Sequence, residues 1–64
     1  MTDYDKVKAL FTELGIGFTE HDEKDNVKVI CCEAGSDKVI GYSGFFTDFE
    51  FDEDGKFIQM GVWE

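Results

Sequence analysis

The chain has 64 residues, of which 42% are hydrophobic and 16% aromatic, and fifteen acidic residues against six lysines give a formal net charge of −9. This length suits one small domain, and the aromatic content excludes a disordered acidic tail. The charge repels nucleic acid and anionic membranes and favours a basic partner, although acidic surfaces also serve solubility. We expect residues 1–64 to form a single domain.

The first predicted element is a helix. Apolar side chains recur at three- and four-residue intervals at Tyr4, Val7, Leu10, Phe11 and Leu14. This spacing predicts a helix over about residues 3–14 with one buried face. Thr2 or Asp3 is suited to cap its first turn, and Gly15 is suited to end it in the left-handed conformation.

After Gly15 the apolar period changes from 3.6 to two residues, which is typical of strands. The turn sequences DEKDN (22–26), AGSDK (34–38) and Asp54-Gly55 separate the segments. The predicted strands cover about residues 16–21, 27–33, 38–52 and 56–63. The predicted fold class is therefore α+β, with the N-terminal helix packed on one face of a three- to four-stranded antiparallel β-meander.

The last hairpin has two alternative registers. With a two-residue turn at Asp54-Gly55, one set of alternating side chains from the two strands forms the buried face. Its pairs are Phe51 with Ile58, Phe49 with Met60 and Thr47 with Val62. A three-residue turn buries Phe57 and Trp63 instead.

In the first register, the sheet face without a helix carries apolar side chains at Ile30, Cys32, Phe46, Phe57 and Trp63. Such a face suggests a partner or a second copy of the chain. The hairpin before it would place Val29 and Cys31 under the helix. That grouping is out of step, by one residue, with the face formed by Phe49 and Phe51. We therefore expect a β-bulge or bend at Gly41 and Gly44, or an odd-length loop, to restore agreement.

Candidate metal ligands occur in the last hairpin. Glu50, Asp52, Asp54 and Gly55 match positions 1, 3, 5 and 6 of a calcium-binding loop. However, Gly61 stands where the bidentate Glu is required, and the flanking segments are strands rather than helices. We therefore expect no metal site.

Candidate nucleophiles also lack the surroundings that would activate them. Cys31 and Cys32 are adjacent in a predicted strand of an acidic chain, which should raise a thiol pKa. We expect one to lie in the core and the other to be exposed. His21, among acids, is expected to be a solvated turn residue. We predict that the protein is not an enzyme and holds no cofactor.

The strongest functional signal is an acidic cluster comprising Asp48, Glu50, Asp52, Glu53 and Asp54. Carboxylates spaced along a hairpin approximate the phosphates of a nucleic acid strand, and such a surface can block a basic channel. The alternative is that these charges prevent edge-to-edge aggregation. With the aromatic residues Phe46, Phe57 and Trp63, they are our candidate partner-binding residues.

The helix KVKALFTELGI, the segment GYSGF, the F-x-F-D-x-D-G hairpin and the final G-x-W-E resemble small acidic proteins of unknown function encoded by bacteriophages and their hosts. This resemblance of pattern covers nearly the whole chain and carries over no catalytic residue. Similar phage proteins include nucleic-acid mimics that inhibit restriction or CRISPR effectors. The resemblance therefore implies an inhibitor, a DNA mimic or an anti-CRISPR protein.

Two functions remain open. In the first, a non-enzymatic acidic protein of phage type occupies the basic nucleic-acid-binding surface of a host defence or nucleic-acid-handling protein. In the second, a homo-oligomeric or accessory structural protein associates through its bare aromatic sheet face, as in a homodimer. Neither binds nucleic acid or membranes directly. We expect a cytoplasmic protein, because no signal sequence and no apolar run of membrane-spanning length is present.

Overall fold

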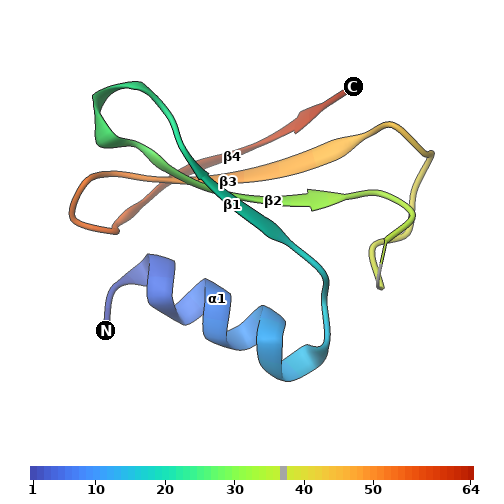
Figure 1. Ribbon diagram of the computed structural model, residues 1–64, viewed down its shortest axis with the longest axis horizontal. Coiled ribbons are helices and arrows are strands. Elements are labelled where there is room, and N and C mark those ends of the chain that lie inside the picture. Colours follow the sequence, from blue (N-terminus) through green and yellow to red (C-terminus); the bar gives the residue numbers. More distant parts are fainter. Residues whose placement is uncertain (37) are drawn as a thin grey trace.

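The computed structural model describes residues 1–36 and 38–64; Asp37, in the predicted AGSDK turn, lies outside the described residues. One N-terminal helix lies against an open antiparallel sheet with the strand order β1-β2-β3-β4, which confirms the α+β prediction (Figure 1). The elements are α1 (Asp3–Leu14), β1 (Thr19–Asp22), a 3₁₀ turn η1 (Lys24–Asn26), β2 (Lys28–Glu33), β3 (Phe46–Phe51) and β4 (Phe57–Trp63).

Helix α1 begins and ends where the sequence pattern predicts. The Thr2 hydroxyl accepts the Asp5 N–H at 3.1 Å, and the Asp5 carboxylate accepts the Thr2 N–H at 3.4 Å, so the cap is Thr2 rather than Asp3. This reciprocal pair satisfies two otherwise free N–H groups. Gly15 ends the helix at a φ of 75°, as predicted, and the Ile16 N–H donates to the Phe11 carbonyl at 2.8 Å.

The core lies between α1 and one face of the sheet. The Tyr4 ring meets Phe51 at 5.3 Å between centroids, and Phe11 meets Phe49 at 5.5 Å. Ile30 and Cys32 are buried on this same face, because their strand partners are Phe49 and Thr47. The expectation that Ile30 and Cys32 lie on the helix-free face is therefore wrong.

The connection between β2 and β3 is longer than predicted but has the same parity. The predicted strand 38–52 is wrong over residues 38–45, which form turns and irregular chain, and the ladder starts only at the Glu33–Phe46 pair. Gly44, at a φ of 92°, lies inside the turn that the Phe45 N–H closes by donating to the Tyr42 carbonyl at 3.3 Å. The connection 34–45 has an even number of residues, so Val29 and Cys31 pair with Glu50 and Asp48 and face away from the helix, and no change of parity at Gly41 and Gly44 or through an odd-length loop occurs.

The β3–β4 hairpin contains both predicted registers, one after the other. At its tip, Gly55 has a φ of 82° and its N–H donates to the Asp52 carbonyl at 2.9 Å. The Asp52 N–H donates to the Lys56 carbonyl at 2.9 Å, which closes a three-residue turn over residues 53–55. Phe51 therefore pairs with Phe57, and the predicted pairing with Ile58 is wrong. A β-bulge then takes up Ile58 as an extra residue.

Beyond the bulge, the register is the one predicted for a two-residue turn. Phe49 pairs with Met60 and Thr47 with Val62, as that prediction states. The bulge keeps the Phe57 ring on the helix side, 5.8 Å from the Phe51 ring, without reversing the faces of the remaining strand.

Candidate functional site

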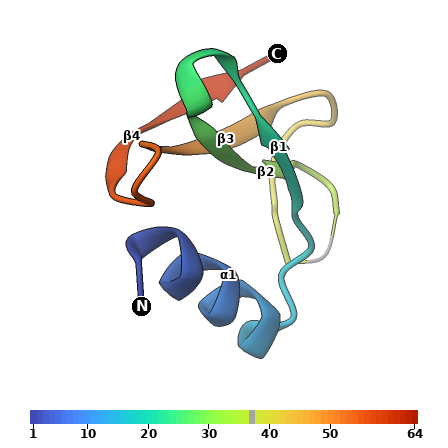
Figure 2. The same cartoon turned by 60° about the vertical axis from the view of Figure 1, so that its left-hand side comes forward.

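The outer face is the surface of the sheet opposite α1, which lies beneath the other surface (Figure 2). Side chains alternate along a strand, and directly paired residues share a face. Phe46, Asp48 and Glu50 of β3 therefore point outward, because Thr47, Phe49 and Phe51 face the helix side. Trp63 of β4 joins them as the direct partner of Phe46.

The most developed feature of the outer face is a hollow of about 430 Å³, called here the Trp63 hollow. Its apolar part comes from Val27, Val29 and Trp63. Its polar part comes from Glu23, Lys24, Asp48 and Glu50. Val29 is only 1% exposed although it lies opposite the helix, whereas Trp63 remains 56% exposed.

The position of Trp63 depends on Gly61, two residues earlier on the same face. A Cβ at Gly61 would lie only 3.2 Å from Trp63 Nε1. The absence of a side chain at Gly61 therefore lets the indole lie close to the sheet. An aromatic wall beside carboxylates suits a cationic side chain, whose aliphatic stem packs on the ring while its charge meets the acids.

The acids of the hairpin tip serve a different purpose. The Asp52 carboxylate accepts the N–H groups of Asp54 and Lys56, each at 2.9 Å, and so holds the turn. The Tyr4 N–H donates to the Gly55 carbonyl at 2.9 Å, and the Asp3 carboxylate accepts the Phe57 N–H at 3.0 Å. The tip is thus docked on the start of α1, where the helix dipole favours negative charge.

The eight predicted partner-binding residues therefore fall into three groups. Phe46, Asp48, Glu50 and Trp63 share the outer face. Asp52, Glu53 and Asp54 lie in the turn beside α1, and Phe57 lies on the helix side. The sequence interpretation missed Val29 and the η1 segment, because the parity argument placed Val29 under the helix.

Fold-back of η1 is what brings Glu23 and Lys24 to the hollow. Asp25 and Asn26 both have φ near 60°, a left-handed conformation that Asn and Asp tolerate better than other residues with side chains. The DN pair in the polar turn 22–26 is the only sequence signal for this fold-back.

The two cysteines point to opposite sides of β2. Cys32 is buried and its pKa is raised by that burial. The pKa of Cys31 rises to about 11, first because of burial and then because of the hydrogen bond and charge of Asp48. The predicted rise is confirmed, and at neutral pH both thiols are protonated and weakly nucleophilic.

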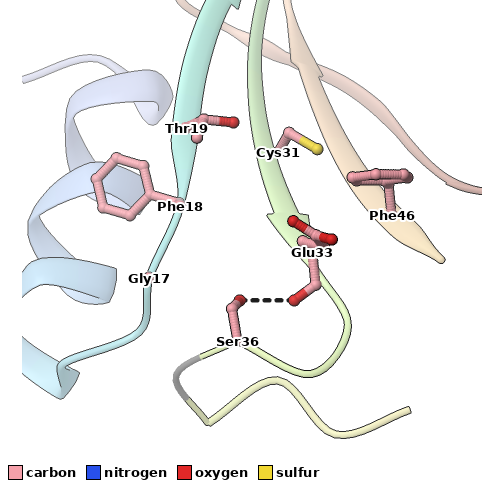
Figure 3. A pocket seen from close by; sticks show the side chains of 7 residues that line it. All are labelled: Gly17, Phe18, Thr19, Cys31, Glu33, Ser36 and Phe46. Carbon is pink, nitrogen blue, oxygen red and sulfur yellow. Dashed lines mark hydrogen bonds between the residues drawn. The ribbon is translucent and has the colours of Figure 1, made fainter. Parts of the chain in front are cut away.

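Cys31 lines a second, smaller hollow of about 210 Å³ with Phe46 and Thr19 (Figure 3). Ser36 lies at its lower end, where its hydroxyl donates to the Glu33 carbonyl at 2.6 Å. That hydroxyl therefore holds the chain after β2 and is not aimed at Cys31. These groups do not form a nucleophile with an adjacent base.

The remaining candidates from the sequence are His21 and the possible metal ligands. His21 is exposed and its Nε2 lies 3.1 Å from Glu23 Oε1. Within residues 1–36 and 38–64, no three His, Cys, Asp or Glu side chains are placed together to hold a metal ion. Over the same residues, no helix is long and apolar enough to cross a membrane.

Comparison of the chain with family models, curated proteins and solved structures finds no match in any of the three. Functional inference for this protein therefore depends on the geometry of its own surfaces.

Proposed function

We propose that this is a non-enzymatic interaction protein that docks its outer face on a basic surface of another protein. The observation that carries the proposal is the Trp63 hollow, in which an apolar wall stands beside the carboxylates of Glu23, Asp48 and Glu50. A lysine or arginine of the partner would lay its stem on Trp63 and its charge against these acids.

The partner's surface, in this proposal, is one that ordinarily binds nucleic acid. Asp48 and Glu50 are two residues apart on one strand face, about 6.8 Å along the strand. This spacing is about two nucleotide steps of roughly 3.4 Å. Asp52 does not extend this pair of carboxylates, because its own carboxylate accepts hydrogen bonds within the turn. Mimicry of a nucleic acid strand is thus assigned to the outer face and not to the hairpin tip.

More specifically, we propose that the protein is a cytoplasmic inhibitor of phage type that blocks a host defence or nucleic-acid-handling protein. The support for this form is the pattern resemblance together with the net charge of −9. A strongly acidic blocker would reach a basic channel by electrostatic steering and would be slowed by salt.

The direct test uses the single tryptophan as a reporter, since Trp63 lines the hollow itself. A hexa-arginine peptide is titrated into the protein while the indole fluorescence is followed. We expect saturable binding that Glu50→Lys weakens about tenfold or more. Glu13→Lys, which makes the same charge change on α1, should leave it nearly unchanged. Equal weakening by both variants would show that only net charge matters.

A second experiment seeks the natural partner. Immobilised protein captures binders from a bacterial lysate at low and high salt, with mass spectrometry and with duplex DNA as competitor. We expect basic nucleic-acid-binding proteins that DNA displaces and that the Glu50→Lys variant fails to capture. Capture that DNA does not compete would contradict the nucleic-acid-mimic form.

The alternative function, self-association through the bare sheet face, meets an electrostatic obstacle at this surface. Stacking two outer faces would bring Asp48 and Glu50 of each copy toward those of the other, and burying like charges is costly. Self-association is therefore better sought at a part of the sheet without charged side chains.

A further inference from the structure

A second hollow lies on the same face of the sheet as the Trp63 hollow. It is the hollow of about 210 Å³ lined by Cys31, called here the Phe46 hollow (Figure 3). Cys31 pairs directly with Thr19 on one side and with Asp48 on the other. Phe46 pairs directly with Trp63. Because directly paired residues share a face, these side chains all belong to the outer face.

Two pairs of residues form the boundary between the hollows. Cys31 lines the Phe46 hollow, and its partner Asp48 lines the Trp63 hollow. Phe46 and Trp63 are divided between the hollows in the same way. The Cβ atoms of directly paired residues lie about 4.5–5.5 Å apart. The two hollows are therefore adjacent, and one ligand can reach both.

The two hollows differ in chemical character. The Trp63 hollow combines an indole wall with the carboxylates of Asp48 and Glu50. The Phe46 hollow is lined by the aromatic residues Phe18 and Phe46 together with Cys31, whereas its carboxylate, Glu33, belongs to an exposed residue. The first hollow thus suits a cationic side chain, and the second suits an apolar one.

The spacing of the hollows along the strands matches an extended peptide. On β2, Val29 lines the Trp63 hollow and Cys31 lines the Phe46 hollow. On β3, Asp48 and Phe46 are divided in the same way. Each step is two residues, or about 6.8 Å along the strand. In an extended peptide, side chains two residues apart also lie on one side with this spacing.

We propose that the outer face binds an extended segment of its partner in which a lysine or arginine is followed or preceded, two residues away, by an apolar residue. The cationic side chain enters the Trp63 hollow and the apolar side chain enters the Phe46 hollow. This inference rests on the proposed function, because it takes the Trp63 hollow as a site for a cation. It adds a requirement that a run of basic residues alone does not meet.

The apolar residue is the source of specificity in this arrangement. The net charge of −9 attracts any polycation, so the acids alone discriminate little among basic segments. A second cation at the Phe46 hollow would lose water against the rings of Phe18 and Phe46, which is unfavourable. An apolar side chain at the same place gains from leaving water. Segments that alternate basic and apolar residues are therefore preferred.

The first test compares short peptides by the fluorescence of Trp63. Acetylated and amidated Gly-Arg-Gly-Leu-Gly and Gly-Leu-Gly-Arg-Gly are each titrated to about 10 mM. The better of the two should bind about fivefold or more tighter than the same peptide with serine in place of leucine. Moving the leucine next to the arginine turns it to the opposite side of the extended peptide and should remove this gain.

The second test locates the leucine of the peptide. Cys31 lines the Phe46 hollow, so the leucine peptide should protect it from iodoacetamide. At about ten times its dissociation constant, the peptide should slow the alkylation about tenfold. The serine peptide at the same occupancy should slow it much less. Mass spectrometry of the digested protein assigns the alkylated cysteine.

A variant and its control complete the test. Cys31→Leu fills the Phe46 hollow and should remove the preference for leucine over serine, while the serine peptide still binds. Thr12→Leu adds the same side chain at an exposed position of α1 and should keep the preference. Circular dichroism shows whether each variant folds, and the peptide and alkylation measurements on the natural chain need no variant.

Three results would overturn this inference and leave the proposed function intact. They are equal binding of the leucine and serine peptides, unchanged alkylation of Cys31 by the bound leucine peptide, and a leucine preference that persists in folded Cys31→Leu. Binding of the hexa-arginine peptide with no binding of either leucine peptide would have the same meaning. Failure of every arginine peptide, the hexa-arginine peptide included, would instead overturn the proposed function and this inference with it.

Discussion

The docking of the hairpin tip on α1 makes Gly55 the position where a single methyl group should cost most. Gly55 has a φ of 82°, and a Cβ there would lie 2.7 Å from the Thr2 Cβ and 2.8 Å from the Thr2 hydroxyl oxygen. Alanine in a left-handed conformation costs about 1–2 kcal/mol. Forcing a methyl group against packed atoms adds about 1–3 kcal/mol. We expect Gly55→Ala to lower the free energy of unfolding by about 2–5 kcal/mol.

A matched control separates the two contributions. Gly35 has a φ of 92°, and an added Cβ would have no atom of residues 1–36 or 38–64 within 4 Å, so Gly35→Ala measures the backbone cost. Replacing Thr2 by glycine removes the obstructing side chain with only a small loss of capping. In that background, Gly55→Ala should cost only about 1–2 kcal/mol, close to Gly35→Ala.

The assay is urea unfolding followed by circular dichroism, with thermal melting as a second measure. A change of 1 kcal/mol shifts the melting temperature of a domain this small by roughly 4–8 °C. Gly55→Ala should therefore lower it by about 8 °C or more. Equal losses for Gly55→Ala and Gly35→Ala would refute the contact between the tip and Thr2.

Three further predictions concern Asp52, Cys31 and Tyr4. Asp52→Ala leaves the Asp54 and Lys56 N–H groups without their acceptor and should lower the free energy of unfolding by about 1–3 kcal/mol, whereas Glu53→Ala should be nearly neutral in urea unfolding. The thiol of Cys31, with its pKa raised to about 11, should react with iodoacetamide at pH 8 more slowly than a free cysteine; an equal rate would contradict its burial. The pKa of Tyr4 is raised to about 12, chiefly by burial and then by the Glu20 hydrogen bond. The unfolded state therefore loses this proton first, so stability should fall from about pH 10 toward pH 12, and Tyr4→Phe should reduce that slope as measured by urea unfolding at each pH.

The local elements of this protein were predictable because their causes lie within a few residues of sequence. The bounds of α1, its Thr2 cap and the left-handed Gly15 follow from the helical period and from capping chemistry. The α+β class follows from one period change after Gly15, and the antiparallel meander from the turn sequences. Glu50 pointing outward and Phe49 inward follow from the period of two in a strand.

What the sequence interpretation got wrong depended on distant contacts. β2 turns Ile30 toward α1 and Val29 toward the opposite face. There Val29 is buried in the hollow formed with η1 and β4, and the alternation of apolar residues in the sequence does not reveal that cover. The turn at Gly55 combines with a bulge at Ile58 because Phe57 must stay beside Phe51 while β4 keeps its register with β3.

The same division applies to the candidate site. Composition and charge pattern by themselves indicated an acidic surface, because charge is a property of the residues wherever they fold. Only the tertiary structure separated Asp48 and Glu50 on the outer face from Asp52, whose carboxylate closes the turn that docks on α1. It also brought Val29 and Glu23 beside Trp63, since a hollow is formed by side chains from several segments that meet only in the folded chain.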